Sequence, residues 1–231
     1  TLLSMVDASV GGKTGVDLGV LKNQIGFFAD PEMVLVDPMF LKTLDERELR
    51  SGLAEIIKYG FTHDPDLWET ISTLETIDYN TVRPLIHRSI VIKNEVVTED
   101  PHEAGLRKVL NFGHTLGHAI ESYHLDHPEK EQITHGEAIA AGMVTALYIS
   151  TELLDFPVEE LHKFKAKILE LYGKLSLKTD DYEAILSLLM HDKKNVSGQV
   201  RFVLMSEIKQ FKLDCVVDSA LMCKALDYYC S

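Results

Sequence analysis

Apolar side chains recur at helical spacing along most of the chain after residue 44. Stretches with this spacing predict helices over about residues 45–60, 78–98, 157–173, 181–190 and from about 217. From Ala138 to Ile149 the sequence is apolar around most of a helical circumference, so we expect this helix at the centre of the core. Thr134 and Glu137 precede it with the spacing of a capping box, which marks a helix start. The pattern indicates a mainly α-helical fold.

A few shorter segments break the helical pattern. The apolar, β-branched run Met33–Asp37 predicts a short buried strand, and Gln199–Met205 predicts a second strand. Residues 1–10 are compatible with a short helix that leads into a glycine-rich loop at residues 11–15. Between His124 and Thr134 the sequence is polar and contains a proline, which is typical of a surface loop.

Composition narrows the classes of partner. The chain has 231 residues, of which 45% are hydrophobic and 26% charged, as expected of a soluble globular protein. Its net charge of -13 disfavours nucleic acid or an anionic membrane as a partner, because both would be repelled. Any anionic substrate must therefore meet a local cluster of cations. The three cysteines form no CxxC pair, so the sequence suggests neither a zinc knuckle nor a disulfide framework.

The sequence shows no targeting signal, and we therefore expect a cytoplasmic protein. We expect no membrane-spanning segment, since no stretch approaches the roughly 18 consecutive apolar residues that a bilayer requires. The N-terminus lacks the charged and apolar blocks of a secretion signal. Because Thr1 runs directly into an amphipathic stretch without an initiator Met, we expect a fragment whose upstream part is missing.

The segment from Glu103 to His118 carries most of the candidate chemistry. If it forms one helix, its polar side chains share a sector about 60° wide. These are Arg107, Asn111, His114 and His118, with Glu103 at the edge of the sector. The adjoining face is apolar and contains Gly113 and Gly117, which would allow a neighbouring backbone to approach closely. We therefore expect packing on one face and chemistry on the other.

Three histidines and one glutamate suggest a metal site. Glu55 lies on the polar side of its predicted helix with Lys58, a spacing that is also typical of a solvated ion pair. His114 and His118 have the i,i+4 spacing that lets two imidazoles reach one metal, and His135 follows the predicted cap at Thr134. One carboxylate with two histidines and an open position is typical of catalytic zinc. The spacing does not decide which two of the three histidines bind.

Several lysines lie in segments that suit an anion. The run Gly12-Lys13-Thr14 is similar to the end of a Walker A loop, but Asp7 stands where that motif needs glycine, so a nucleotide P-loop is disfavoured. Lys13 and the pair Lys22-Asn23 remain candidates for binding an anion, although an ordinary glycine turn with exposed lysines explains them equally well. The basic run at residues 191–195 is usually a solvated turn.

Five phrases, read together, resemble one enzyme family. They are V-D-A-S-V-G-G-K-T-G-V at 6–16, K-N-Q-I-G at 22–26, A-E-I-I-K-Y-G at 54–60, L-N-F-G-H-T-L-G-H-A-I-E at 110–121 and H-G-E-A-I-A-A-G-M at 135–143. Their order and content resemble 3-dehydroquinate synthase, a sugar-phosphate cyclase. The resemblance implies an N-terminal α/β domain that binds NAD and a C-terminal helical domain that binds metal. Only the second is expected here, as residues 44–231, preceded by an interdomain segment with a glycine-rich loop and a short strand at residues 1–43.

The same resemblance assigns roles to individual residues. The implied ligands of the divalent metal, zinc or cobalt, are Glu55, His114 and His135, so that His118 faces the substrate instead. The implied substrate pocket consists of Asp7, Lys13, Asn23, Lys58, Lys93, Arg107, Asn111, His118 and Lys193 or its neighbour Lys194. The residues expected to border NAD are Thr1, Lys13, Lys22, Phe40, Leu41, Lys42 and Thr43.

The implied reaction converts 3-deoxy-D-arabino-heptulosonate 7-phosphate, a phosphorylated sugar acid, to 3-dehydroquinate and phosphate in the shikimate pathway. NAD is regenerated in each turnover. The family is expected to act as a homodimer in which an arginine of the upstream region reaches the neighbouring active site. We therefore expect this truncated chain to be inactive alone. Asp17, where the family usually has Asn, and a long loop between His118 and His135 depart from the pattern.

Three other functions remain open at this point. A related cyclase that makes an inosose or a valiolone would share the fold, the metal and NAD, but Lys93 and His118 favour dehydroquinate chemistry by resemblance. A metal-dependent polyol or alcohol dehydrogenase would instead release NADH as a product. The chain is also compatible with an inactive helical metal-binding module.

Overall fold

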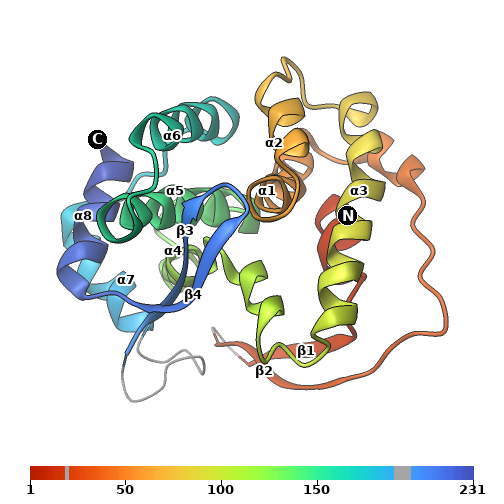
Figure 1. Cartoon of the computed structure of the whole chain (residues 1–231), viewed down its shortest axis with the longest axis horizontal. Coiled ribbons are helices and arrows are strands. Elements are labelled where there is room, and N and C mark those ends of the chain that lie inside the picture. The colour runs from red at the N-terminus through yellow and green to blue at the C-terminus, as the bar shows by residue number, and fades with distance from the viewer. Residues whose placement is uncertain (19–20, 190–198) are drawn as a thin grey trace.

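The computed structural model describes residues 1–18, 21–189 and 199–231, and it leaves out the side chains of residues 17–24. The α-helices of this part (Figure 1) are α1 (Glu46–Thr62), α2 (Pro65–Ser72), α3 (Tyr79–Glu99), α4 (His114–Asp126), α5 (His135–Leu154), α6 (Val158–Tyr172), α7 (Tyr182–Leu189) and α8 (Ser219–Cys230). The strands are β1 (Lys13–Leu18), β2 (Leu21–Phe28), β3 (Arg201–Glu207) and β4 (Gln210–Val216). Short non-α turns are η1 (Ser4–Ala8), η2 (Pro38–Thr43), η3 (Leu106–Asn111) and η4 (Thr179–Asp181). The predicted mainly helical fold is confirmed.

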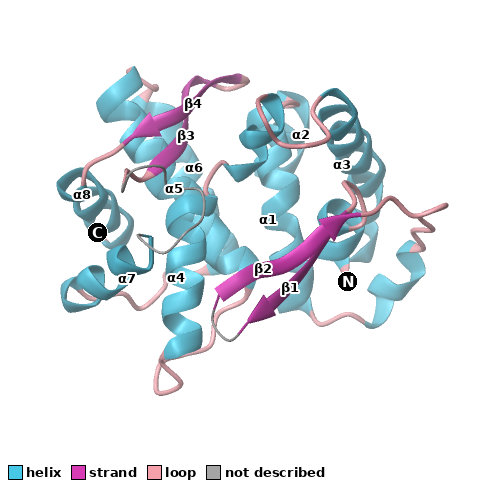
Figure 2. Ribbon diagram, turned by 90° about the horizontal axis from the view of Figure 1, so that it is seen from below, coloured by secondary structure: helices cyan, strands magenta, loops and turns pink. Residues whose placement is uncertain are grey.

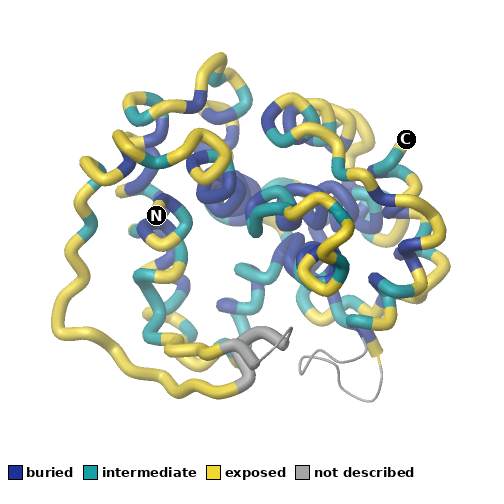
Figure 3. The backbone as a smooth tube through the Cα atoms, turned by 180° about the vertical axis from the view of Figure 1, so that it is seen from behind, coloured by how far each residue is buried: buried dark blue, intermediate teal, exposed yellow. Residues whose placement is uncertain are grey.

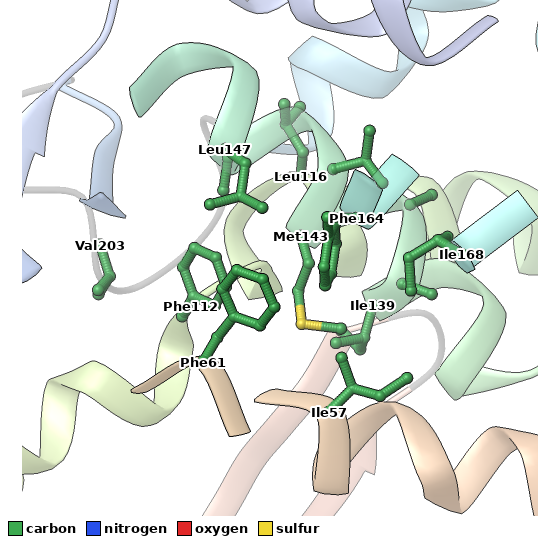
Figure 4. Close-up of a cluster of buried hydrophobic side chains, with 14 of the residues drawn as sticks. Ile57, Phe61, Phe112, Leu116, Ile139, Met143, Leu147, Phe164, Ile168 and Val203 are labelled. Carbon is green, nitrogen blue, oxygen red and sulfur yellow. The ribbon is translucent and has the colours of Figure 1, made fainter. Parts of the chain in front are cut away.

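Helix α5 forms the centre of the molecule, as its apolar sequence predicted. It packs against α1, α4, α6, α8 and β3. Side chains from these elements meet in one cluster that includes Ile57, Phe61, Phe112, Leu116, Ile139, Met143, Leu147, Phe164, Ile168 and Val203 (Figure 4). Contrary to the expectation from sequence, α5 is long and apolar enough to cross a membrane, but 72% of its apolar window is buried inside the fold. It is a core helix.

Side-chain caps mark the starts of α1, α2 and α5. Asp45 caps α1 by accepting the Arg47 N–H, and Thr134 and Glu137 form the predicted capping box of α5. The unpredicted helix α2 follows Asp64, which accepts the Leu67 N–H, and begins with Pro65. Aspartate followed by proline is a helix-start signal, so the sequence contained the information for α2.

Residues 103–118 do not form one helix, so the predicted polar stripe is wrong in its geometry. Leu106–Asn111 is a 3-10 turn, and α4 begins only at His114. Gly113 between them has φ of +78°, a left-handed conformation that interrupts the helical path. The expected close approach is confirmed, since a Cβ on Gly113 or Gly117 would collide with Met143 or Ile139 of α5.

Two antiparallel hairpins complete the structure (Figure 2). In the first, β1 pairs with β2, and Gly15 lies opposite Gly26. In the second, β3 pairs with β4, and β3 packs on α5. The strand predicted at residues 199–205 corresponds to β3, whereas β4 was not predicted. Its alternately exposed and half-buried side chains carry too little apolar signal.

The buried strand predicted at Met33–Asp37 is absent. This segment has no strand pairing, and Met33 and Leu35 are 77% and 83% exposed. Figure 3 shows it as part of a long exposed arc. A strand needs a neighbour for its backbone hydrogen bonds, and no other strand of the described ranges pairs with this one. The apolar pattern of this segment therefore does not correspond to a buried strand in the described part of the chain.

Candidate functional site

The three candidate histidines converge on Glu55. The ring nitrogens of His114, His118 and His135 lie within 4.8 Å of one another. His114 and His118 are one turn apart at the start of α4, and His135 is the first residue of α5. Oε1 of Glu55, in the middle of α1, is 3.3 Å from Nε2 of His114 and 3.5 Å from Nε2 of His135. Three helices thus bring one carboxylate and three imidazoles together.

Hydrogen bonds on the far side of two rings define which nitrogen faces Glu55. Nδ1 of His114 lies 3.0 Å from the carbonyl oxygen of Phe112, which can only accept, so Nδ1 donates and Nε2 of the neutral ring keeps its lone pair. Nδ1 of His135 lies 3.2 Å from the Glu121 carboxylate. A carboxylate behind a histidine is a common way to orient a metal-binding imidazole.

Glu55 Oε1 is the atom that these rings face. It is fully buried and has no hydrogen-bond partner within the described part of the chain. A buried carboxylate oxygen that accepts no hydrogen bond is unfavourable unless a positive charge lies against it. The residues therefore fit a divalent metal that Glu55 and the surrounding imidazoles could hold.

The pKa values of this cluster reflect its burial and its charges. Burial disfavours ionised Glu55, but Lys58 and His114 outweigh it, and the pKa of Glu55 is well below its usual value. Burial and the nearby Lys58 ammonium lower the pKa of His114. For His135 the penalty of burial is overcome by Glu121 and Glu55, which raise its pKa to about 9. Near neutral pH the carboxylate is therefore ionised, and the metal-free site holds a proton on His135, which a metal would displace.

A cavity of about 640 Å³ adjoins the cluster. The predicted site residues that line it are Asp7, Lys13, Lys58, Lys93, Arg107, Asn111, His114, His118 and His135. Glu55 lies buried behind them. Helices α1, α3, α4 and α5, the turns η1 and η3, and the β1–β2 hairpin all contribute to its walls. Although the 103–118 segment is not one helix, all five polar residues of the expected stripe, Glu103 included, still reach this cavity.

Other predicted residues lie elsewhere. The side chains of Lys22 and Asn23, and Lys193 and Lys194 altogether, are outside the described residues. Thr1 and the residues Phe40–Thr43 do not line the cavity beside the histidines. Phe40 is 67% exposed, whereas the Leu41 side chain is buried in the core. Their expected role at NAD stays a prediction.

Cations in the wall of the cavity are held by carboxylates. Lys58 forms a fully buried ion pair with Glu55, so the solvated pair considered from sequence is wrong. The reason is that α5 covers this face of α1. Nζ of Lys93 is 2.7 Å from Oδ1 of Asp7, and it also donates to the Asp7 carbonyl. Burial lowers the pKa of Lys93, although Asp7 opposes the shift.

The hairpin is tied to the cavity by a second set of contacts. Arg107 donates to the carbonyl of Gly11 at 2.9 Å and to that of Pro101 at 2.6 Å. Lys13 of β1 forms an ion pair with Glu103, whose other oxygen accepts from Nδ2 of Asn111 at 2.6 Å. These contacts bring anion-binding groups from the glycine-rich loop and from η3 to the same opening.

Glu121 was missed as a site residue. Its carboxylate orients His135, yet the sequence reasoning gave it no role. The signal available was its position, because Glu121 follows His114 by seven residues and His118 by three and so lies on their face of α4. Tyr59 was also missed, and its hydroxyl donates to the carbonyl of Val6 beside Asp7.

Comparison with known proteins gives consistent relatives. The chain is 39% identical over 231 residues to 3-dehydroquinate synthase of Parabacteroides distasonis and 45% identical over 237 aligned positions to that of a Picosynechococcus species. These matches cover 99% and 98% of this chain but 65% and 63% of the relatives, so the chain spans less than two thirds of their length.

Two solved structures of synthases share the fold. One is 2-epi-5-epi-valiolone synthase from Streptomyces hygroscopicus with NAD+ and Zn2+ bound, with a TM-score of 0.83 and 25% identity over 100% of this chain and 64% of that one. The other is 2-deoxy-scyllo-inosose synthase complexed with carbaglucose-6-phosphate, NAD+ and Co2+, with a TM-score of 0.81 and 25% identity, which covers 98% of this chain and 64% of that one.

Family models place the chain among these proteins. The model described as 3-dehydroquinate synthase C-terminal matches residues 52–195, and the one described as 3-dehydroquinate synthase N-terminal matches residues 1–51. The two matches are contiguous and meet within α1, close to the candidate metal site. With the convergence of Glu55 and the histidines beside a cationic cavity, they establish that this chain belongs to the 3-dehydroquinate synthase family.

Proposed function

We propose that this chain supplies the metal- and substrate-binding part of a 3-dehydroquinate synthase. Such an enzyme converts 3-deoxy-D-arabino-heptulosonate 7-phosphate to 3-dehydroquinate and phosphate with NAD and a divalent metal. The observation that carries the proposal is the buried, unpartnered Glu55 Oε1 facing His114 and His135 beside a lysine- and arginine-lined cavity. The proposal keeps the division into a cleft segment, residues 1–43, and a helical domain, residues 44–231.

In this proposal Glu55, His114 and His135 hold zinc or cobalt, and His118 faces the substrate. When bound, the metal supplies Lewis-acid stabilisation of developing oxyanion charge and NAD supplies reversible hydride acceptance. Glu121 and the Phe112 carbonyl hold the two imidazoles with Nε2 toward Glu55. This orientation prepares the three ligands before the metal arrives.

The cations of the cavity would bind and orient the substrate's phosphate and carboxylate. Lys93 is paired with Asp7 and Lys13 with Glu103, so a bound anion would compete with these carboxylates for the same ammonium groups. Arg107 and Asn111 line the same opening. The main task of these side chains is therefore to position a substrate that carries two anionic groups. By family likeness, Asn23 and Lys193 or Lys194 join this pocket, and Thr1, Lys13, Lys22 and residues 40–43 border NAD.

Dehydroquinate synthesis is favoured over the related cyclisations by sequence. The chain is 39% and 45% identical to dehydroquinate synthases but 25% identical to the valiolone and inosose synthases. Lys93 and His118, at which such cyclases are expected to differ, both line the cavity. Family likeness also supports cytoplasmic location, a role in the shikimate pathway, a homodimer, and no nucleic-acid or membrane partner.

The decisive experiment uses a chimera. The 231-residue chain replaces the matched part of the Parabacteroides distasonis relative, whose remaining part is kept. With the heptulosonate phosphate, NAD and Zn2+ or Co2+, we expect phosphate release without net NADH. Net reduction of NAD would instead indicate a dehydrogenase and contradict the proposal.

Two variants of the chimera connect the activity to the site. Glu55→Ala should abolish phosphate release and Co2+ binding, because it removes the carboxylate ligand. Glu95→Ala, which removes an exposed carboxylate from α3, is the matched control and should retain both. The 231-residue chain alone should bind Co2+ but release no phosphate.

A further inference from the structure

Three residues of α1 spaced four apart face the start of α5. Arg47, Ser51 and Glu55 lie on one side of the helix, and about 12 Å of helix separates the first from the last. Opposite them stand the capping box of α5, then Gly136, then His135. The proposed metal ligand Glu55 is thus the last of three successive contacts between these helices.

The middle contact is a close backbone approach. The Gly136 N–H donates to Oγ of Ser51 at 3.1 Å, and a Cβ on Gly136 would collide with the Ser51 backbone. This contact sets the distance between α1 and α5. It does not by itself fix the rotation of the first turn of α5, on which the direction of His135 depends.

The first contact fixes that turn from the other side. Nε and Nη2 of Arg47 donate to the two carboxylate oxygens of Glu137 at 2.7 and 2.8 Å, and Nη2 also donates to the Gln132 carbonyl at 2.8 Å. Glu137 Oε2 simultaneously accepts the Thr134 N–H at 2.7 Å. One guanidinium therefore holds residues on both sides of His135 in a two-pronged geometry that a lysine cannot reproduce.

Arg47 and Glu137 are absent from the lining of the cavity beside the histidines, so they act through other residues. The Arg47 side chain is 45% exposed and that of Glu137 is 12% exposed, so the pair is partly screened by solvent. Its position, between the helices that carry two proposed metal ligands, suits it to set their relative orientation.

We infer that Arg47, through Glu137, is a positioning residue that sets His135 relative to Glu55 and so tunes the affinity of the site for its metal. The inference rests on the proposed function, because it assumes that Glu55 and His135 share one metal. It predicts that loss of the Arg47–Glu137 link weakens metal binding in a chain that remains folded.

The test measures Co2+ affinity and the visible Co2+ spectrum of the 231-residue chain. Arg47→Met should weaken Co2+ binding about 10-fold and change the spectrum, at the lower end of the effect of outer-shell residues. Arg47→Lys should recover part of the affinity. Arg50→Met is the matched control, since Arg50 pairs with Glu46 within α1 and makes no ion pair with α5, and it should stay within about twofold of wild type.

Further variants separate the possible outcomes. Glu137→Gln keeps an acceptor for Thr134 and should resemble Arg47→Met, while the double variant should be no weaker than the weaker single one. If Arg47→Met does not fold, Glu137→Gln decides the question. Folded variants that bind Co2+ with wild-type affinity and spectrum would overturn the inference. If Glu55→Ala also bound Co2+ like wild type, the proposed function itself would fail.

Discussion

Helix α5 and the β1–β2 hairpin both carry runs of apolar side chains, but their surroundings are opposite. In α5, Ile139, Met143 and Leu147 are completely buried. In the hairpin, Ile25 and Phe27 are 66% and 73% exposed. A helix satisfies its own backbone hydrogen bonds and needs only packing partners, which surround α5 on several sides. A hairpin of two strands covers few of its own side chains and is only marginally stable by itself.

The hairpin is held by its edge contacts instead of by a core. Arg107 reaches the carbonyl of Gly11, Lys13 pairs with Glu103, and the Phe28 ring meets the His102 ring edge-on at 5.6 Å. All of these contacts lie on the side of the cavity. Similar apolar patterns therefore contribute differently to the free energy of unfolding in the two regions, and substitutions can measure that difference.

The largest expected effect comes from matched phenylalanines. Phe164 of α6 is fully buried against Phe61, with ring centroids 4.6 Å apart, whereas Phe27 of β2 is 73% exposed. Phe164→Ala should lower the free energy of unfolding by about 3–5 kcal/mol, and Phe27→Ala by less than about 0.5 kcal/mol. Denaturant unfolding of the two variants measures both values. Equal losses would refute the contrast.

Two ion pairs give the next comparison. Lys58 and Glu55 are both buried, so Lys58→Met removes the lysine partner of a buried carboxylate and should cost about 3 kcal/mol in the metal-free chain. The Lys13 side chain is 50% exposed, and Lys13→Met should cost less than about 1 kcal/mol although it also removes a partner from a glutamate. Chemical denaturation at pH 7 with a chelator present tests the ranking. A larger loss in the Lys13 variant would reverse the interpretation of the two regions.

The smallest effect concerns the loop that leads to His135. Lys130 donates to Asp181 at 2.7 Å, as does Tyr123. Burial opposes ionisation of Asp181, but the hydrogen bonds from Lys130, Lys178 and Tyr123 prevail and lower its pKa to about 2. Because this pKa is lower in the folded chain, the ionised form stabilises the fold above about pH 4, and that contribution disappears as pH falls toward about 2.

Lys130→Met should therefore shift this acid-induced loss to higher pH and cost about 1 kcal/mol at pH 7. Lys163→Met, which removes an exposed i,i+3 pair with Glu160, is the control and should leave the acid profile unchanged. Thermal melts between pH 2 and 7 measure both. An identical acid profile in the Lys130 variant would show that the ion pair does not hold the loop.

The helices and the residues of the site were largely predictable, but their geometry was not. Apolar spacing indicated α1, α3, α5, α6, α7 and α8 because local periodicity directly encodes a buried helical face. The same reasoning placed His118 and Arg107 on one helix, which is wrong because Gly113 turns the chain between them. Residue spacing also could not choose among the three histidines, since their convergence depends on how α1, α4 and α5 pack.

What the sequence alone determined is the inventory: a helical chain, an apolar central helix that starts at Thr134, and the motifs whose residues resemble a dehydroquinate synthase. Only the tertiary structure decided that Glu55 is buried with Lys58, that Glu121 stands behind His135, and that Met33–Asp37 is exposed. The physical reason is that the two kinds of information differ in their range along the chain. Periodicity is local and indicates which face of a segment tends to be buried. Whether that face is buried, and the electrostatics that follow from its burial, depend on which distant segment packs over it.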